Sequence, residues 1–220
     1  MLSFWANLNA GAPLTTLILT RHGHVPGIKP ERFRGRIEVA LSPLGEQEAQ
    51  AVAQRIAATW KPVKVYTSTL GRCIATGAAI AAACGISSEA DDALCDIDYG
   101  QWQWETHEEA QAAAPDLYAL WHTAPQLMRF PGGESLQDLA VRAADLIRRV
   151  GAAHAGETVV LVGHDSVNRV LLTHLLDLPL SAYWRFAQEP CNLNVIEWNG
   201  TAAKLLRLND TSHLSGLTAG

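Results

Sequence analysis

Two arginines and two histidines in this chain each follow a short apolar run. They are Arg21 and His22 after residues 17–20, Arg72 a few residues beyond the run 63–66, and His164 just beyond the run 159–162. Buried parallel strands appear in a sequence as short, β-branched apolar runs. Because ligands of open α/β sheets bind beyond the carboxyl ends of such strands, we expect the four side chains to meet in one crevice.

This combination of side chains favours the chemistry of a phosphate group. The rigid fork of arginine matches two phosphate oxygens at once, and Arg72 stands where a helix should begin, so the positive end of that helix would also attract an anion. A neutral imidazole with a pKa near about 6.5 is a competent nucleophile or proton carrier. The sequence therefore predicts a pocket for an oxyanion of about two negative charges, and phosphate fits best.

Signals for strands and helices alternate along the sequence, and the elements that they predict must position these residues. Predicted strands cover residues 14–20, 63–66 and 159–162, and a hairpin at the sheet edge covers 194–198 and 203–208. Predicted helices begin at Ser42-Pro43 and cover 75–83 up to Gly85, 106–121 with a break at Pro115, 135–153 and 166–176, whereas 91–105 is expected to be irregular. This order predicts an α/β fold, a three-layer α/β/α sandwich with a mostly parallel central sheet.

Composition indicates one enzyme-sized domain. With 48% hydrophobic residues, the 220 residues can bury one large core, so we expect a single domain over 1–220, with a peripheral extension at 1–13, a lid excursion at about 96–134 and a peripheral, frayed tail at 209–220. The net charge of -5 disfavours nucleic acid. No apolar stretch approaches the roughly 20 residues of a membrane span. Scattered cysteines and the lack of a signal-peptide pattern predict reduced thiols and a cytoplasmic protein.

Three motifs in register resemble the histidine phosphatase superfamily, which includes the phosphoglycerate mutases. They are Arg21-His22-Gly23 after the first strand, residues 68–72 after the second and Gly163-His164 after a late strand, and the resemblance extends over about residues 16–198. It implies a phosphoglycerate-mutase-like fold and a metal-independent reaction without a cofactor. His22 would attack phosphorus and become phosphorylated, while Arg21, Arg72 and His164 hold the charge of the transferred group. The other nitrogen of His22 is expected to donate to a backbone carbonyl, which fixes the tautomer.

The leaving group needs a proton, so a carboxylic acid should stand across the phosphorus atom. The family usually has a glutamate after a leucine and before a Gly-x-Trp segment, and the corresponding stretch of this chain, 94–102, has Asp96 there. Aspartate is more acidic than glutamate by about 0.4 pKa units, so donation near neutral pH requires a raised pKa, from desolvation or from the bound phosphate. Asp98 is the reserve candidate. Alternatively, both aspartates are loop residues that cap backbone amides.

The chain departs from the family pattern near the phosphate. Val25 and Ile28 stand where relatives often have polar groups, and His24 and Arg34 are the candidates to replace those donors, although Arg34 could equally be a solvated loop cation. Asp165 follows the late histidine, and its backbone N–H, at a helix start, is available to an anion, while its side chain is expected to cap that helix.

Further residues could lie around the pocket. The aromatic residues of the excursion, Trp102, Trp104, Trp121 and Phe130, suit a lid over an organic leaving group, or ordinary packing. Glu134 and Ser135 could line the pocket rim, and a helix cap explains Ser135 equally well.

Rival functions account for fewer of these residues. A metal-binding His22-x-His24 of a barrel amidohydrolase would need roughly 250 residues and an eightfold βα pattern. The nucleophile turn of an α/β hydrolase would need the serine after His164 one place earlier. An aspartyl-phosphate enzyme would need a buried strand before Asp96. None of the three explains Arg21 together with Arg72.

The predicted function is that of a phosphatase acting on small phosphomonoesters. The alternatives are a phosphoglycerate-type mutase, which the compact and acidic stretch 97–163 disfavours, and a non-catalytic relative that binds a phospholigand. The substrate is open among a sugar phosphate, a nucleotide, α-ribazole phosphate and a phosphoprotein. The expected partner is a small-molecule phosphate ester, with no nucleic acid and no membrane, and the sequence leaves a homodimer open.

Overall fold

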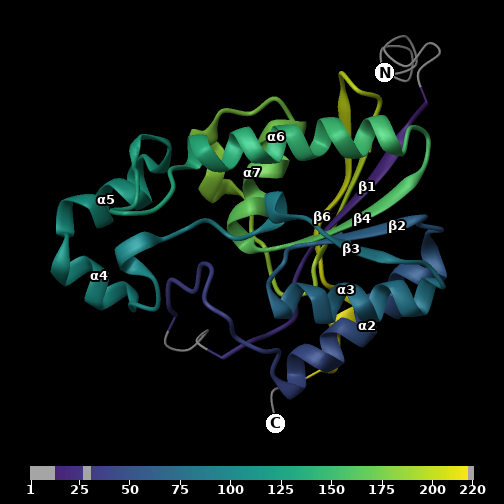
Figure 1. Cartoon of the computed structure of the whole chain (residues 1–220), viewed down its shortest axis with the longest axis horizontal. Helices are drawn as coiled ribbons and strands as arrows, with labels where there is room; N and C mark the ends of the chain where they lie inside the picture. Colours follow the sequence, from purple (N-terminus) through teal and green to yellow (C-terminus); the bar gives the residue numbers. More distant parts are fainter. Residues whose placement is uncertain (1–12, 27–30, 218–220) are drawn as a thin grey trace.

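The computed structural model describes residues 13–26 and 31–217, and in this part of the chain six strands form one sheet (Figure 1). The strands are β1 (Thr15–Arg21), β2 (Lys64–Thr67), β3 (Ser88–Ala90), β4 (Thr158–Gly163), β5 (Leu193–Trp198) and β6 (Ala203–Asp210), in the order β3-β2-β4-β1-β5-β6. Strands β1 to β4 pair in parallel, and β5 runs antiparallel to both β1 and β6. The mostly parallel sheet is confirmed.

Helices cover both faces of the sheet. Helices α6 (Leu136–Ala153) and α7 (Asp165–Leu175) lie above it in Figure 1, and α2 (Pro43–Thr59) and α3 (Gly71–Cys84) lie below it. Two shorter helices, α4 (His107–Ala113) and α5 (Pro115–Thr123), project at one end of the molecule. The five 3₁₀ turns are η1 (Asp92–Leu94), η2 (Gly100–Trp102), η3 (Pro125–Leu127), η4 (Leu180–Arg185) and η5 (Ser212–Leu214). The three-layer arrangement is confirmed.

The alternation of side chains along the strands divides the core between the two helical layers. Leu17 and Leu19 of β1 pack in the apolar cluster under α6 and α7, whereas Ile18 packs in the cluster over α2 and α3. All three side chains are fully buried. A strand that is buried on both faces reads as a continuous apolar run, which is why the sequence revealed β1 and β4 so clearly.

Local chemistry explains where the helices begin and end. The side chain of Ser42 accepts a hydrogen bond from the backbone N–H of Gly45, and Pro43 occupies the first helical position of α2. Helix α3 ends at Gly85, whose φ of 67° lies in the left-handed region that glycine adopts without strain. Both boundaries are as predicted.

At the edges of the fold, the sequence analysis missed one strand and was wrong about the tail. Strand β3 was not predicted, because its three residues are exposed and carry no apolar run. The tail does not fray after Asn209: β6 continues to Asp210, and η5 packs against α2. There, Nε2 of His213 donates to the carbonyl of Cys191 over 2.9 Å. Residues 1–12 and 218–220, from the predicted extension and tail, lie outside the described residues.

The register of the sheet brings the strand ends together. Arg21 at the end of β1 pairs with Gly163 at the end of β4, and Thr67 at the end of β2 pairs with Val162. The residues that follow these strands therefore leave the sheet side by side at one edge, as expected for parallel neighbours.

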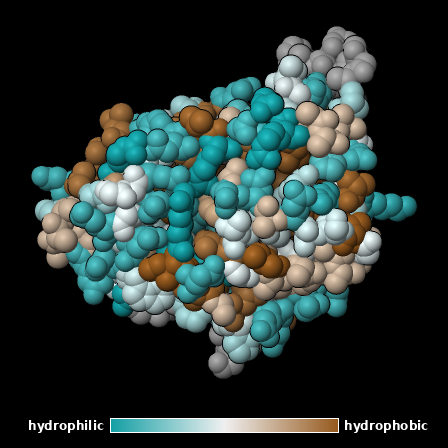
Figure 2. Space-filling model, in the orientation of Figure 1, coloured by the Kyte–Doolittle hydropathy of each residue, from teal (hydrophilic) through white to brown (hydrophobic). Residues whose placement is uncertain are grey.

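Hydrophilic residues spread over most of the face shown in Figure 2, with hydrophobic residues in small groups between them. No helix in the described ranges is both long enough and apolar enough to cross a membrane.

Candidate active site

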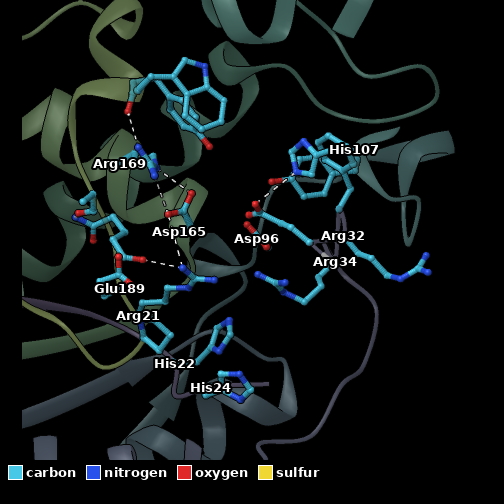
Figure 3. A pocket seen from close by; sticks show the side chains of 18 of the residues that line it. Arg21, His22, His24, Arg32, Arg34, Asp96, His107, Asp165, Arg169 and Glu189 are labelled. Atoms are coloured by element: carbon cyan, nitrogen blue, oxygen red, sulfur yellow. Dashed lines mark hydrogen bonds and ion pairs between the residues drawn. The ribbon is translucent and has the colours of Figure 1, made fainter. Parts of the chain in front are cut away.

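A cavity of about 480 Å³ opens at the carboxyl ends of β1 and β4. Its walls come from the loop after β1, from α2 and α7, from the excursion between β3 and α6, and from the segment before β5. Figure 3 shows Arg21, His22 and His24 at one end and Asp96 across from Arg21.

His22 is held in one orientation at the wall of this cavity. Its side chain is almost completely buried, and Nδ1 lies 2.7 Å from the carbonyl oxygen of Gly23. A carbonyl only accepts, so Nδ1 carries the proton and Nε2 keeps its lone pair. The expected carbonyl partner is confirmed.

Gly23 is required for this loop because a Cβ atom there would lie only 2.4 Å from the backbone oxygen of Gly45. The loop after β1 is therefore pressed against the first turn of α2, which stabilises the carbonyl that orients His22.

The surroundings keep His22 neutral. Burial lowers the pKa of His22 well below its usual value of 6.5, and the positive charges of Arg72 and Arg21 lower it further. A neutral imidazole with an unprotonated Nε2 is the form that can attack phosphorus. The guanidinium groups thus oppose protonation of His22 and could also attract an anion.

Arg21 and Arg72 are fixed by backbone carbonyls. Arg21 donates to the carbonyl of Gln188 over 2.7 Å. Arg72, fully buried behind the cavity wall, donates to the carbonyls of Ile37 and Gly35 over 2.8 and 2.7 Å. Within the described part of the chain, the buried Nε atoms of both arginines have no hydrogen-bond partner. Each arginine therefore keeps an N–H donor for an anion.

His164 lies behind His22 rather than in the cavity wall. It is the N-cap residue of α7 and is fully buried. Its ring centroid is 5.1 Å from that of His22, at an interplanar angle of 63°. Nε2 of His164 lies 2.9 Å from the hydroxyl of Ser68, which follows β2. The structure thus brings together one residue from each of the three motifs: His22, Ser68 and His164.

Asp96 lines the cavity and is almost completely buried. Burial raises its pKa above the usual 3.8, while the charge of Arg72 opposes this rise. Its Oδ2 atom lies 3.9 Å from Nδ1 of His164. Desolvation was one of the two expected causes of a raised pKa, and it is present.

Asp98, the reserve candidate, lies elsewhere. Its Oδ1 accepts a hydrogen bond from the backbone of Gly100 over 2.8 Å, and its Oδ2 is 4.0 Å from Arg36. It does not line the cavity. Asp98 therefore behaves as the backbone-capping aspartate of the alternative interpretation. Asp96 also accepts a backbone N–H, from Ile97 to Oδ1 over 3.0 Å, but unlike Asp98 it lines the cavity.

The cavity is also lined by the three residues predicted to add donors near the phosphate, His24, Arg34 and Asp165. Nδ1 of His24 lies 2.8 Å from the hydroxyl of Ser42. Arg34 is only 9% exposed, so its interpretation as a solvated loop cation is wrong. Its guanidinium points across the cavity toward that of Arg21 (Figure 3). Burial, and then the charge of Arg21, lowers the pKa of Arg34.

The predicted capping role of the Asp165 side chain is wrong. Helix α7 begins at Asp165 itself, so His164 occupies the cap position. The carboxylate of Asp165 instead accepts two hydrogen bonds from Arg169, over 2.8 and 3.1 Å, and lies 3.9 Å from Arg21. Asp165 therefore connects Arg21 of β1 with Arg169 of α7.

Several cavity residues were missed by the sequence analysis. They include Glu48, Tyr99, Arg169, Tyr183, Trp184 and Glu189. Arg169 stands one helical turn after Asp165, a spacing typical of an ion pair, and this signal could have revealed it. No pattern in residues 183–189 indicated that this segment lies against the cavity.

The aromatic residues of the excursion mainly pack on one another. The rings of Trp102 and Trp121 lie 5.4 and 4.9 Å from that of Phe130, and all three residues are buried. Trp121 alone among the four predicted lid aromatics lines the cavity, and Trp104 is 39% exposed. Ordinary packing therefore accounts for Trp102 and Phe130.

Two further expectations concern the pocket rim and the family's polar positions. Neither Glu134 nor Ser135 lines the cavity, and Ser135 caps α6 through a capping box, so the rim placement is wrong and the cap is confirmed. Val25 is fully buried, and Ile28 lies outside the described residues.

Comparison with protein families gives a match over residues 17–211 to the histidine phosphatase superfamily (branch 1). Phosphoserine phosphatase 1 of Hydrogenobacter thermophilus is 30% identical over 201 residues, which cover 91% of this chain and 95% of that protein. Glucosyl-3-phosphoglycerate phosphatase of Mycolicibacterium vanbaalenii is 32% identical over 171 residues, covering 74% and 75% of the two chains. The solved structure of YhfR from Bacillus stearothermophilus superimposes with a TM-score of 0.86 at 30% identity, covering 91% of this chain and all of that one.

Proposed function

The chain belongs to the histidine phosphatase superfamily (branch 1), and on this premise we propose that it is a phosphatase that hydrolyses small phosphomonoesters through a phosphohistidine on His22. The observation that supports this proposal most is the state of His22: a buried imidazole with its proton held at Nδ1 and its Nε2 lone pair beside two arginines.

In the first step, the Nε2 lone pair of His22 forms a bond to phosphorus while the bond from phosphorus to the ester oxygen breaks. The electron pair of the broken bond goes to that oxygen, which takes the proton of Asp96. Arg21 lines the cavity and binds the charge of the transferred group, with Arg34, His24 and the start of α7 as further donors. Arg72 and His164, both fully buried, stabilise that charge from behind the cavity wall. The leaving group departs as a neutral alcohol, and Asp96 becomes a carboxylate.

In the second step, water attacks the phosphorus atom of phosphohistidine. The carboxylate of Asp96 accepts a proton from this water, the bond between phosphorus and Nε2 breaks, and the electron pair returns to His22. Inorganic phosphate then leaves. In this mechanism arginines supply the positive charge, so no metal and no cofactor is required.

We propose that the excursion at about 96–134 acts as a lid over the leaving group. Tyr99, His107 and Trp121 come from this segment and line the cavity opposite the phosphate end. Together with Tyr183 and Trp184, they offer aromatic surface and a few polar atoms, which suits the organic half of a phosphate ester.

The substrate is best sought among small metabolites. Phosphoserine and glucosyl-3-phosphoglycerate, which name the activities of relatives, come first in a panel of phosphate esters, followed by sugar phosphates, nucleotides and α-ribazole phosphate. Release of inorganic phosphate distinguishes hydrolysis from transfer within the substrate, and therefore a phosphatase from a mutase.

The nucleophile is tested by replacing His22 with alanine. His22→Ala should lower kcat/KM for p-nitrophenyl phosphate by at least about 10³-fold, because the first bond to phosphorus cannot form. Acid-quenched wild-type enzyme should contain an acid-labile phosphoryl group that His22→Ala lacks. His174→Ala, an exposed histidine of α7, is the matched control and should behave as wild type.

Retention of turnover or of the trapped phosphoryl group in His22→Ala would overturn the assignment. A wild-type protein that binds phosphate yet turns over no ester of the panel would instead be a non-catalytic phospholigand-binding relative.

A further inference from the structure

We propose that Arg142 of α6, outside the cavity, positions Asp96 as the proton donor. This inference rests on the proposed function, because it concerns the acid of that mechanism. Arg142 belongs to none of the three sequence motifs, and its side chain is 18% exposed.

The guanidinium of Arg142 binds the backbone on which Asp96 stands. Its NH1 donates to the carbonyls of Ala93 and Cys95 over 2.8 and 2.6 Å. Its NH2 donates to the carbonyl of Asp96 itself over 3.0 Å. One side chain thus satisfies three carbonyls within four residues and, with its two further hydrogen bonds to Glu134, uses all five N–H donors of a guanidinium.

Glu134 fixes the guanidinium from the other side. Its carboxylate accepts hydrogen bonds from Nε and NH2 of Arg142, over 3.2 and 3.0 Å. It also accepts the backbone N–H of Asp98 over 3.0 Å and lies 3.0 Å from NH2 of Arg36. Despite its burial, the hydrogen bonds and charge of Arg142 lower the pKa of Glu134, so the pair stays ionised.

The segment needs such support because it lacks regular structure. Between the end of η1 at Leu94 and the start of η2 at Gly100, no helix or strand holds the chain. The carboxyl of Asp96 is attached by a single methylene, so any shift of its backbone moves the proton donor directly. Misplacement of a reacting group by about 1 Å can reduce a rate by about 10²-fold.

A positioning role and a purely structural role make different predictions. Loss of Asp96 alignment slows only those substrates whose leaving oxygen needs a proton. General loss of structure slows every substrate. The leaving group therefore discriminates between the two roles.

Two esters of similar size provide this comparison: benzyl phosphate, which releases a strongly basic alkoxide, and p-nitrophenyl phosphate, which releases a stable phenolate. The value of kcat/KM reports the first step, the only one that involves the leaving group. Arg142→Lys keeps the charge but has three N–H donors on one nitrogen, so it cannot bind the three carbonyls and Glu134 together. It should lower kcat/KM for benzyl phosphate by about 10-fold to 100-fold and that for p-nitrophenyl phosphate by less than about 3-fold.

Arg148→Lys, a matched change of an exposed arginine on the same helix, should alter neither value. Inhibition by inorganic phosphate should be unchanged in Arg142→Lys, because its contacts are with the donor segment and not with the phosphate-binding arginines. If Arg142→Lys lowers the melting temperature markedly, Glu134→Gln serves as the second variant and should show the same preference.

The controls separate this proposal from the assignment of the acid. Asp96→Asn should lower kcat/KM for benzyl phosphate far more than that for p-nitrophenyl phosphate. If Asp96→Asn slows both esters equally, Asp96 is not the acid and the proposed mechanism fails. If Asp96→Asn discriminates between them but Arg142→Lys and Glu134→Gln do not, the acid stands and the positioning role of Arg142 is overturned.

Discussion

At the scale of single residues, the proposed donor Asp96 shows how burial can offset the greater intrinsic acidity of aspartate. The family pattern has a glutamate at the donor position, and aspartate is the stronger acid by about 0.4 pKa units in model peptides. The structure buries its carboxyl and so raises its pKa. A shift of one pKa unit corresponds to about 1.4 kcal/mol between the two protonation states, so modest desolvation outweighs the intrinsic difference.

The pKa shifts of His22 and Asp96 together predict the pH dependence of the proposed reaction. His22 must be neutral, and its lowered pKa moves the loss of activity on acidification below about 6.5. Asp96 must be protonated, so activity toward benzyl phosphate is lost as pH rises through the raised pKa of Asp96. The ratio of kcat/KM for benzyl phosphate to that for p-nitrophenyl phosphate should fall with rising pH.

The phosphate groups of the two esters ionise at different pH, because p-nitrophenyl phosphate is the more acidic ester, so Asp96→Asn provides the reference profile. In Asp96→Asn the ratio should be low and should reflect only this difference between the substrates. A wild-type ratio with the same pH dependence as that of Asp96→Asn would show that no titrating Asp96 assists the leaving group.

The location of a site residue could be predicted from the sequence where a predicted strand or helix places its backbone. Arg21 ends strand β1 and His22 comes directly after it, so the strand itself places both residues at the edge of the sheet. Glu189 and Trp184 reach the same cavity through a segment without periodicity, which only the folded chain brings there. The three carbonyl contacts of Arg142 likewise depend on how α6 packs, and no pattern in the sequence indicates them.

At the scale of elements, strong periodicity and caps predicted the fold well. Ser42-Pro43 and Gly85 mark helix boundaries by their own chemistry, and the structure has them there. Strand β3 escaped prediction because it is short and polar, and it forms only through pairing with β2. The start of α7 was misplaced by one residue, and this error gave Asp165 the capping role that belongs to the position of His164.

Close packing of α3 on the sheet gives a prediction about stability. A Cβ atom at Gly77 would lie 2.2 Å from Cγ2 of Thr67 in β2, so the helix would have to move away. Gly77→Ala should therefore lower the free energy of unfolding by about 1–3 kcal/mol relative to Gly71→Ala. Gly71 is the first residue of the same helix, where a Cβ meets only the far end of the Glu38 side chain.

Urea denaturation of both variants measures this difference. At the interior position 77, alanine is intrinsically favoured over glycine by about 1 kcal/mol, so a lower stability of Gly77→Ala would report the clash with Thr67. Equal stability of the two would mean that α3 and β2 do not pack as closely as described.

At the scale of the whole molecule, the cavity joins distant parts of an acidic chain. Arg21 and Glu189 stand near opposite ends of the sequence and line one cavity, and in a chain with a net charge of -5 this cavity holds both arginines and carboxylates. An anion that binds there contacts segments from both helical layers, so binding and global stability are coupled.

Inorganic phosphate should therefore stabilise the fold. At a concentration 100-fold above its Kd, phosphate should contribute about 2.7 kcal/mol and raise Tm by several degrees, compared with chloride at equal ionic strength. Arg21→Gln should lose most of this rise, and Arg148→Gln should keep it. An equal rise in Arg21→Gln would mean that phosphate binds outside this cavity.

The end of the chain has a practical consequence for anyone who produces this protein. His213 donates to the carbonyl of Cys191, and the backbone N–H of Cys191 donates to the carbonyl of Arg21 over 3.0 Å. Two hydrogen bonds thus connect a terminal turn to an arginine of the proposed active site. We therefore expect that a truncation or tag that displaces residues 211–217 would also disturb the backbone of Arg21.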